Sequence, residues 1–223
     1  MTKVREIKDK LNEQFARIGH ALSSPKRLEL LELLHQCEKT VETLVRDTGM
    51  SVANTSQHLQ VLRGAGLVET RREGSYVIYR MPDDQVYAMV SSMKRVAESR
   101  LAEVERVLAD LADDQHEVEV MDRAKLTKLA KAGRIIVLDV RPEDEYVAGH
   151  IPHAISIPLD QLKSHLNKLP KDQRIVAYCR GPYCVLSGEA VRVLRSKGFE
   201  ATRLGDGIAE WKAAGQPVVS GQA

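Results

Sequence analysis

Apolar residues in the first half of the chain recur at helical spacing. From Val4 to Leu22 they follow steps of three and four, which mark one face of a helix. A second helix is predicted to begin at Pro25, because Ser24 can cap it and proline is favoured at the first helical position. Residues 41–48 are predicted as a third helix that ends at the following glycine.

A fourth helix begins after Ser51, which is suited to cap it, and stops at the Gly-Ala-Gly sequence 64–66. Two β-prone runs follow, 67–72 and 75–80, and the Glu-Gly pair between them is typical of a β-hairpin. Two helices joined by a tight glycine turn and followed by a hairpin indicate a winged helix-turn-helix.

A long helix is predicted from Pro82 to about Leu111. Its apolar residues alternate steps of four and three, which suits packing against a partner helix; packing on its own domain is the alternative. These residues are Val86, Val90, Met93, Ala97, Leu101, Val104, Leu108 and Leu111.

Beyond Asp113–His116 the pattern changes to an alternation of strands and helices. Helices are expected at 122–132, 159–169 and 185–197, and strands at 135–140, 155–157, 174–179 and 201–204. This order predicts an α/β domain with a mainly parallel sheet and helices on both of its faces. The fold class is therefore two domains, a mainly α winged helix-turn-helix over 1–113 and an α/β domain over 117–220.

Composition changes this picture little. The 223 residues, 43% of them hydrophobic, suffice for two domains of about 100 residues each. A net charge of +2 is too mild to indicate nucleic acid, so any DNA binding must come from a local face. Three cysteines form no even disulfide framework and are expected to be reduced. Since no apolar run approaches the roughly 20 residues of a membrane span, we expect a cytoplasmic protein without a membrane partner.

The fourth helix is predicted to present a polar face to DNA. The inward residues are Thr55, Leu59 and Leu62, and the outward amides are Asn54, Gln57 and Gln60. Amide side chains are suited to paired hydrogen bonds with adenine edges. The surrounding residues that could hold phosphates are Ser51, Ser56, Arg63, Arg71, Arg72 and Ser75.

Segments 24–28, 51–68 and 71–79 closely resemble the ArsR/SmtB family of winged-helix repressors, and the resemblance extends over about 14–110. It implies a homodimer built from the first and last helices of this half. It also implies that the fourth helix enters the major groove of a double-stranded DNA operator, while the wing touches the backbone or the minor groove. Many members bind metals through a Cys-x-Cys pair or through ligands on the last helix. This chain has no cysteine in 41–48 and no histidine in 83–111, so no metal is predicted and sensing is sought elsewhere.

Cys179 stands where a strand turns into a helix. Unpaired backbone N–H groups and the positive end of the helix dipole favour a thiolate at such a position. Ligands of parallel sheets bind at the carboxyl ends of strands, which is where this cysteine is expected. The residue is therefore a candidate nucleophile.

Residues 138–152, 178–184 and 205–211 resemble three motifs of the rhodanese family, over about 117–218. The resemblance implies that Cys179 accepts a sulfane sulfur as a persulfide from thiosulfate, polysulfide or another persulfide. It implies no cofactor. Backbone groups of a curled loop would cradle the anion, and the predicted loop positions are Gly181, Tyr183 and Val185.

Neighbouring residues have supporting or alternative roles. Asp139 and Arg141 match family positions that are mainly structural. Arg180 could attract anionic donors, or its side chain could point to solvent. Val185 occupies the position at which phosphatase-like members have an arginine, so oxyanion chemistry is disfavoured. His153 stands where the family usually has glycine, in a turn, and receives no catalytic role.

Cys184 is a second thiol at the end of the loop. If the loop is curled, Cys184 could attack a persulfide on Cys179, release sulfide and form a disulfide. The alternative, a small buried residue that starts the helix, stays open. The leading hypothesis is a repressor that couples sulfane-sulfur chemistry to promoter binding. The alternatives are a tethered sulfurtransferase and a DNA-binding protein whose rhodanese domain is a silent interaction module.

Overall fold

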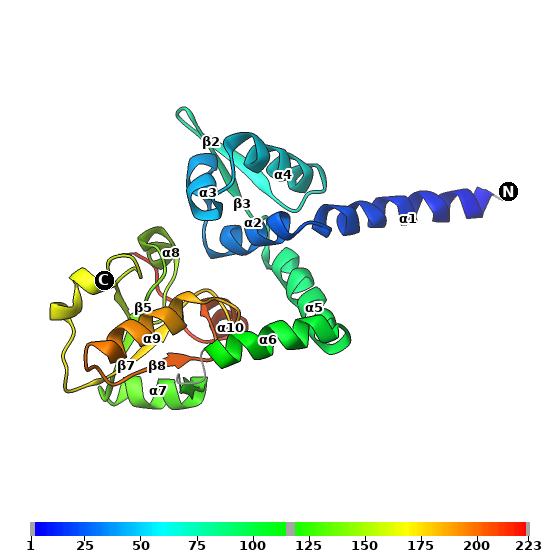
Figure 1. The fold of residues 1–223 in the computed structure, drawn as a ribbon. Helices are drawn as coiled ribbons and strands as arrows, with labels where there is room; N and C mark the ends of the chain where they lie inside the picture. Colours follow the sequence, from blue (N-terminus) through cyan, green and yellow to red (C-terminus); the bar gives the residue numbers. More distant parts are fainter. Residues whose placement is uncertain (1–2, 115–118, 222–223) are drawn as a thin grey trace. The chain divides into compact units, whose positions relative to one another are not determined.

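The computed structural model describes residues 3–114 and 119–221. The chain divides into two compact units, Met1–Leu101 and Ala102–Ala223, which are coloured blue to green and green to red in Figure 1. The division falls before the boundary predicted at Asp113–His116, of which residues 115–116 lie outside the described part. It coincides instead with a break between two helices at Leu101.

Helices make up most of the first unit. They are α1 (Lys3–Leu22), α2 (Pro25–Gln36), α3 (Val41–Thr48), α4 (Val52–Gly64) and α5 (Asp84–Arg100). Ser24 occupies the N-cap position of α2, but its side chain makes no capping hydrogen bond there. The Ser51 hydroxyl does cap α4, because it accepts a hydrogen bond from the Asn54 N–H at 3.3 Å. Gly49 ends α3 with a φ of 66°, a conformation that glycine adopts without steric cost.

The wing is a three-stranded antiparallel sheet. Strands β1 (Lys39–Thr40), β2 (Glu69–Glu73) and β3 (Tyr76–Arg80) follow the order β1-β3-β2. Glu73 pairs with Tyr76, so the turn is Gly74–Ser75, one residue later than predicted. Gly74 has a φ of 60°, as the first position of such a turn requires. The two-residue β1 is too short to leave a sequence pattern.

The prediction of one long helix from Pro82 to Leu111 is wrong in one respect, because the structure has two helices over this segment. Leu101 has extended backbone angles, φ −110° and ψ 108°, and separates α5 from α6 (Ala102–Asp114). Neither proline nor glycine marks this break in the sequence. Val86 and Val90 of α5 are buried in the core of the first unit, so the beginning of the helix packs on its own domain.

One apolar face in the first unit is exposed to solvent. Its residues on α1 are Val4, Ile7, Leu11 and Phe15, with exposed fractions of 76%, 53%, 51% and 68%. The periodicity that predicted this helix therefore describes a face that the rest of the described chain does not cover. A continuous apolar face of this kind is typical of an interface.

The second unit is built on a five-stranded parallel sheet. Its strands are β4 (Val120–Met121), β5 (Ile135–Asp139), β6 (Ile155–Ser156), β7 (Arg174–Tyr178) and β8 (Ala201–Leu204), in the order β4-β8-β7-β5-β6. Each neighbouring pair of these strands is parallel, as the sequence predicts. The centre of the sheet is β7, whose end carries Cys179.

Helices cover both faces of this sheet (Figure 1). They are α7 (Arg123–Lys131), α8 (Glu143–Ala148), α9 (Leu186–Ser196) and α10 (Ile208–Ala213). Alternate residues of β7 point to opposite cores: Ile175 packs in the core that includes α9, and Val176 in the core that includes α7 and α10. No helix among the described residues is both long and apolar enough to cross a membrane.

The helix predicted at 159–169 is wrong. The segment forms two 3₁₀ turns, η1 (Leu162–Ser164) and η2 (Leu166–Lys168), joined at His165. The hydroxyl of Ser164 and the ring of His165 both bond to the carbonyl of Gln161, at 2.8 and 3.0 Å. Such local side-chain bonds compete with the hydrogen bonding of a continuous α-helix.

Candidate functional site

Cys179 lies at the carboxyl end of β7, where the sequence places it. Its side chain is buried, with 2% of the residue exposed. The sulfur is 3.4 Å from the Ser187 hydroxyl, 3.5 Å from the Cys184 carbonyl oxygen and 3.8 Å from that of Gly181. The loop between β7 and α9 therefore curls around the sulfur.

The two thiols of this loop have opposite pKa shifts. Burial alone would raise the pKa of Cys179, but hydrogen bonds from the Cys184 thiol and the Ser187 hydroxyl lower it to about 7. The pKa of Cys184 is raised, because its thiol bonds to Cys179 and because it is buried. Cys179 is therefore the sulfur that ionises first, with Cys184 as a proton donor to it.

Ser187 is a site residue that the sequence analysis missed. It is buried in the first turn of α9, and both its hydroxyl and its N–H favour the Cys179 thiolate. A serine near the start of a helix is common for capping reasons, so the sequence carried no specific signal for this role.

Backbone N–H groups of the loop lie beside both of its sulfurs. The N–H groups of Gly181 and Ser187 face the Cys179 sulfur, and those of Arg180 and Leu186 face the Cys184 sulfur. Tyr183 and Val185 instead have exposed side chains, at 37% and 43%. Their predicted part in holding an anion is untested.

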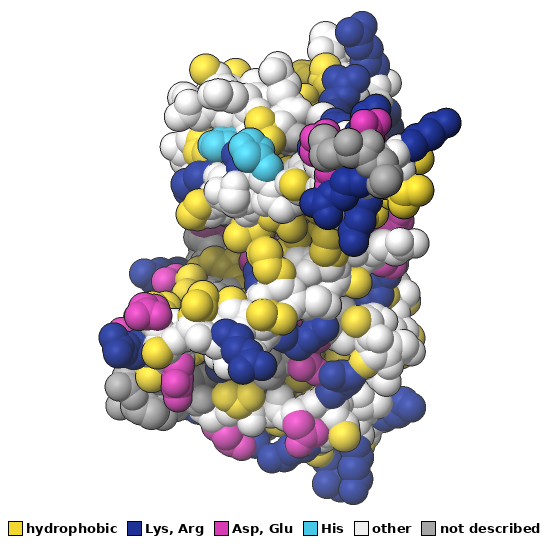
Figure 2. Space-filling view, turned by 90° about the vertical axis from the view of Figure 1, so that its right-hand side faces the viewer, with side chains coloured by type: hydrophobic (Ala, Val, Ile, Leu, Met, Phe, Trp, Pro, Cys, Tyr) yellow, Lys and Arg dark blue, Asp and Glu magenta, His cyan; other side chains and the backbone are white. Residues whose placement is uncertain are grey.

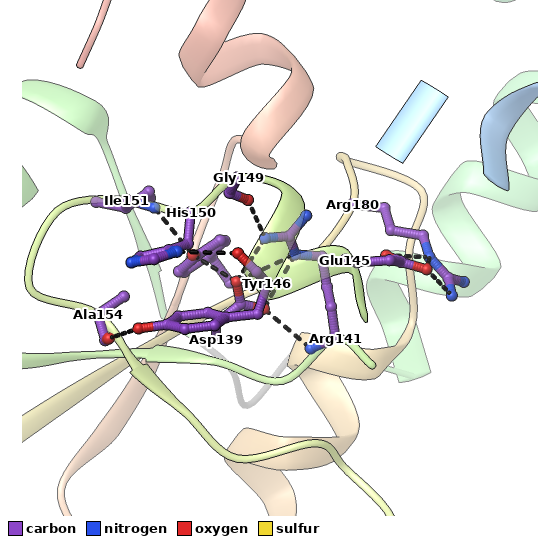
Figure 3. Close-up of polar contacts among 10 residues, drawn as sticks. Asp139, Arg141, Glu145, Tyr146, Gly149, His150, Ile151, Ala154 and Arg180 are labelled. Atoms are coloured by element: carbon purple, nitrogen blue, oxygen red, sulfur yellow. Dashed lines mark hydrogen bonds and ion pairs between the residues drawn. The ribbon is translucent and has the colours of Figure 1, made fainter. Parts of the chain in front are cut away.

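The side chain of Arg180 is paired with a carboxylate, and its attraction of anionic donors stays a prediction. Its guanidinium binds the carboxylate of Glu145 on α8, with N···O distances of 2.7, 3.0 and 3.1 Å (Figure 3). The Glu145 side chain is fully buried, and the Arg180 side chain is 18% exposed. This bidentate pair fixes the loop to the neighbouring helix.

A second segment supports the loop from the other side. A side chain on Gly207 would place its Cβ 2.2 Å from the Gly181 nitrogen, so only glycine fits there. The next residue, Ile208, donates its N–H to the Cys179 carbonyl at 3.2 Å. The loop is therefore held by backbone contacts that begin immediately before α10.

Asp139 and Arg141 form a buried network at the ends of β5 and β7 (Figure 3). Arg141 donates to Asp139 at 2.6 and 3.0 Å and to the Gly149 carbonyl at 2.7 Å. The hydroxyl of Tyr178, the residue before Cys179, donates to Asp139 at 2.6 Å. Burial disfavours the Arg141 cation, but the Asp139 carboxylate outweighs this effect and raises the pKa of Arg141. The network holds the strand that presents Cys179.

The backbone at His153 accounts for the glycine that the rhodanese family usually has at this position. His153 has a φ of 65° and is the one non-glycine residue with positive φ in the described chain. The left-handed region favours glycine at this turn.

The burial of α4 confirms its predicted faces. Thr55, Leu59 and Leu62 are buried. The exposed residues are Ser51, Asn54, Gln57, Gln60 and Arg63, whereas Ser56 is half-buried. Figure 2 shows basic side chains dispersed among acidic ones over one side of the molecule, so a DNA face must be defined locally.

The wing arginines differ from one another. Arg71 binds Glu38, with N···O distances of 2.5 and 3.0 Å, and also pairs with Glu73. The hydrogen bond from Arg71 lowers the pKa of Glu38. Arg72 is exposed, as is Ser75 in the turn. Of the two arginines, Arg72 is the one that projects to solvent without a carboxylate in the described residues.

Cys37 lies half-buried just beyond α2, in the first unit. Within residues 3–114 and 119–221, no three His, Cys, Asp or Glu side chains are grouped so that they could hold a metal ion.

Both halves of the chain match known families. Residues 24–70 match the arsR family of bacterial regulatory proteins, and residues 122–214 match the rhodanese-like domain. The HTH-type transcriptional regulator Rv0324 of Mycobacterium tuberculosis is 44% identical over 211 residues, which cover 95% of this chain and 92% of that protein. A sulfurtransferase of Allochromatium vinosum is 28% identical over 46% of this chain and 94% of its own length.

One similar solved structure is the homodimeric winged helix-turn-helix DNA-binding domain of Mb0332 from Mycobacterium bovis. It is 40% identical with a TM-score of 0.40, and the match covers 42% of this chain and 87% of that one. The 44% identical relative extends over both halves. The chain therefore belongs to the ArsR family of bacterial regulatory proteins, as a DNA-binding transcriptional regulator with a C-terminal rhodanese-like domain.

Proposed function

We propose that this regulator is a homodimeric, cytoplasmic repressor that accepts sulfane sulfur on Cys179 and thereby changes its affinity for its operator. The observation that carries the proposal is the setting of this thiol. It is a buried sulfur with a pKa lowered to about 7, placed within 3.4 Å of a hydroxyl and beside a second thiol. A structural cysteine in an apolar core would have a raised pKa and no such donors.

The first chemical step is nucleophilic transfer. The Cys179 thiolate attacks the outer sulfur of a donor, the new S–S bond forms, and the donor's own bond to that sulfur breaks. With thiosulfate the leaving group is sulfite, and with a persulfide it is a thiolate. The N–H groups of Gly181 and Ser187 favour the anionic sulfur at this position.

The second step uses Cys184. Cys184 gives its proton to the outer sulfur of the Cys179 persulfide anion and attacks the inner sulfur as a thiolate, which forms a Cys179–Cys184 disulfide and releases hydrosulfide. The Cys184 proton leaves with the hydrosulfide, so atoms and charge balance. The proximity of the two sulfurs supports this step, since each is the hydrogen-bond partner of the other. A cellular dithiol would return the pair to its reduced form.

DNA binding is assigned to α4 and the wing. Asn54, Gln57 and Gln60 are the proposed base-reading residues, because they are exposed on one face of a helix whose other face is buried. Arg72 is the proposed phosphate contact. The exposed apolar face of α1 supports a homodimer, since a second copy would cover it.

One observation favours a second function. A protein named sulfurtransferase is 28% identical to this chain over 46% of its length. In that case Cys179 passes its sulfur to an external acceptor, and the DNA-binding half tethers the enzyme or controls its gene. The two functions differ in whether sulfur on Cys179 changes DNA affinity.

A binding titration distinguishes them. Operator DNA is selected with the reduced full chain, and its affinity is then measured by fluorescence anisotropy before and after treatment with a polysulfide donor. Cys179→Ser is treated in parallel. A change in affinity that Cys179→Ser abolishes supports the sensor. An unchanged affinity despite a persulfide in the mass spectrum supports the tethered enzyme, and failure to select any DNA sequence would overturn the repressor.

A further inference from the structure

We infer, as an extension that rests on this proposed function, that the ion pair between Arg123 and Asp206 passes a change at the Cys179 loop to the beginning of the rhodanese-like domain. The pair is a coupling element and takes no part in the sulfur chemistry. Its removal should leave sulfur transfer intact and abolish most of the effect of sulfur on DNA affinity.

Modification of Cys179 requires the surrounding backbone to move. The residue is 2% exposed, and its sulfur already contacts the carbonyl oxygens of Gly181 and Cys184 and the Ser187 hydroxyl at 3.4 to 3.8 Å. A sulfane sulfur would lie about 2 Å from this sulfur, and a disulfide would draw the Cys184 sulfur to the same distance. Because a close-packed interior has little spare volume, either product displaces the loop.

The displaced loop would carry Gly207 with it. A Cβ on Gly207 would lie 2.2 Å from the Gly181 nitrogen and 2.3 Å from the carbonyl carbon and oxygen of Arg180, so the two backbones are already in close contact. The N–H of the next residue, Ile208, donates to the Cys179 carbonyl at 3.2 Å. A shift of residues 179–181 therefore moves the segment that begins at Gly207.

Asp206 decides how far this shift travels. It lies between Gly207 and Gly205, and Gly205 is held by the sheet, because its N–H donates to the Met121 carbonyl of β4 at 3.0 Å. A residue between two glycines can absorb a displacement as a hinge. Its carboxylate, however, accepts a hydrogen bond from the Arg123 side chain at 2.7 Å. The ion pair therefore turns the hinge into a link between the loop and α7.

The other end of this link is the beginning of the domain. β4 ends at Met121, Asp122 caps α7, and Arg123 is the first residue of that helix. These elements follow α6, with which the second unit begins. A displacement of Arg123 therefore acts on the end of the domain that the chain enters from the DNA-binding half.

The test measures sulfur transfer and DNA affinity on the same variants of the full chain. Arg123→Gln and Asp206→Asn each break the pair. Because the two side chains are 33% and 28% exposed, neither substitution should unfold the domain. Each variant is treated with sodium polysulfide. Addition of sulfur to Cys179 is followed by intact mass, and operator affinity by fluorescence anisotropy before and after treatment.

We expect both variants to bind the operator as the wild type does when they are reduced, and to gain sulfur on Cys179 at the wild-type rate. The factor by which polysulfide changes operator affinity should fall by about threefold or more. The double variant should lose no more than either single variant, because both substitutions remove the same interaction. Arg123→Lys keeps the cation and should retain most of the response.

Lys128→Gln is the matched control. It removes a positive charge from α7 at the same open cleft, but leaves the Arg123–Asp206 pair in place, and should respond as the wild type does. A wild-type response in Arg123→Gln and Asp206→Asn, or an equal loss in Lys128→Gln, would overturn the coupling role. Loss of sulfur transfer in the two variants would overturn it as well, since the pair would then support the loop itself. If the wild type gained no sulfur on Cys179, or gained it without a change in affinity, the proposed function would fail instead.

Discussion

The hydroxyl of Ser187 should set the pH at which the nucleophile works. It lies 3.4 Å from the Cys179 sulfur and is buried with it, so water cannot easily replace its hydrogen bond. Ser187→Ala removes this donor and leaves a small side chain of similar shape. The N–H of the same residue remains, as does the Cys184 thiol.

The size of the effect follows from the strength of the lost bond. A hydrogen bond to a charged group contributes about 1.5–3 kcal/mol, less for sulfur, and one pKa unit corresponds to about 1.4 kcal/mol. We expect the pKa of Cys179 to rise by roughly one unit from its value of about 7. The ionised fraction at pH 7 then falls from about a half to about a tenth, and the rate of thiolate reactions falls about fivefold.

The measurement is the rate of Cys179 alkylation by iodoacetamide as a function of pH, in a Cys37→Ser background. The rate rises with pH as the thiol ionises, and Ser187→Ala should move the midpoint to higher pH. Ser196→Ala is the control, because its exposed hydroxyl bonds to the Val193 carbonyl on the same helix. A midpoint that is unchanged in Ser187→Ala would refute the assigned role and leave the backbone N–H groups as the main cause.

The remaining predictions concern the second thiol, the DNA face and the dimer. Cys184→Ser should accumulate a persulfide on Cys179 after donor treatment, because the resolving thiol is gone; wild-type masses at every time would leave Cys184 as packing only. Gln57→Ala should weaken operator binding by about 1–3 kcal/mol and spare non-specific binding, whereas Arg72→Ala should weaken both and reduce the salt slope by about one. Identical behaviour of the two would contradict the recognition-helix assignment. Phe15→Asp should yield monomers in light scattering if the α1 face is the dimer interface, and an intact dimer would exclude that face.

Local sequence patterns predicted most of the helices and strands, because residues within or next to each element determine where it begins and ends. Gly49 and Ser51 act within a few residues, and α3 and α4 begin and end close to where these residues place them. The break at Leu101 and the 3₁₀ turns around His165 were missed for a different reason. Both segments keep the apolar spacing of a helix. Their conformation differs from a continuous helix through the extended backbone at Leu101 and the side-chain hydrogen bond of His165, which the apolar spacing does not reveal.

The sequence predicted where the site lies, but not which side chains contact its residues. The strand-to-helix position of Cys179 is readable from neighbouring residues, and the structure places the thiol there. The partners of Arg180 and Arg71 were not readable, because Glu145 and Glu38 lie some 35 and 33 positions away in the sequence. The positions of Arg180 beside Cys179 and of Arg71 in the wing each suggest a contact with a bound anion. In the structure each guanidinium instead forms an ion pair with a carboxylate of the protein.

The position of the Cys179 sulfur therefore depends on three contacts with residues distant in sequence. Tyr178 and Asp139 anchor the strand before it, Glu145 holds Arg180 after it, and Gly207 supports the loop from behind. Because these groups are buried, they keep the N–H groups and Ser187 aimed at one sulfur without reorganisation when charge develops there. The Cys184 thiol is hydrogen-bonded to Cys179 in the same loop, so under the proposed function a persulfide on Cys179 would form beside this second thiol. Coupling between the two thiols is thus a property of the loop's supports as much as of the cysteines.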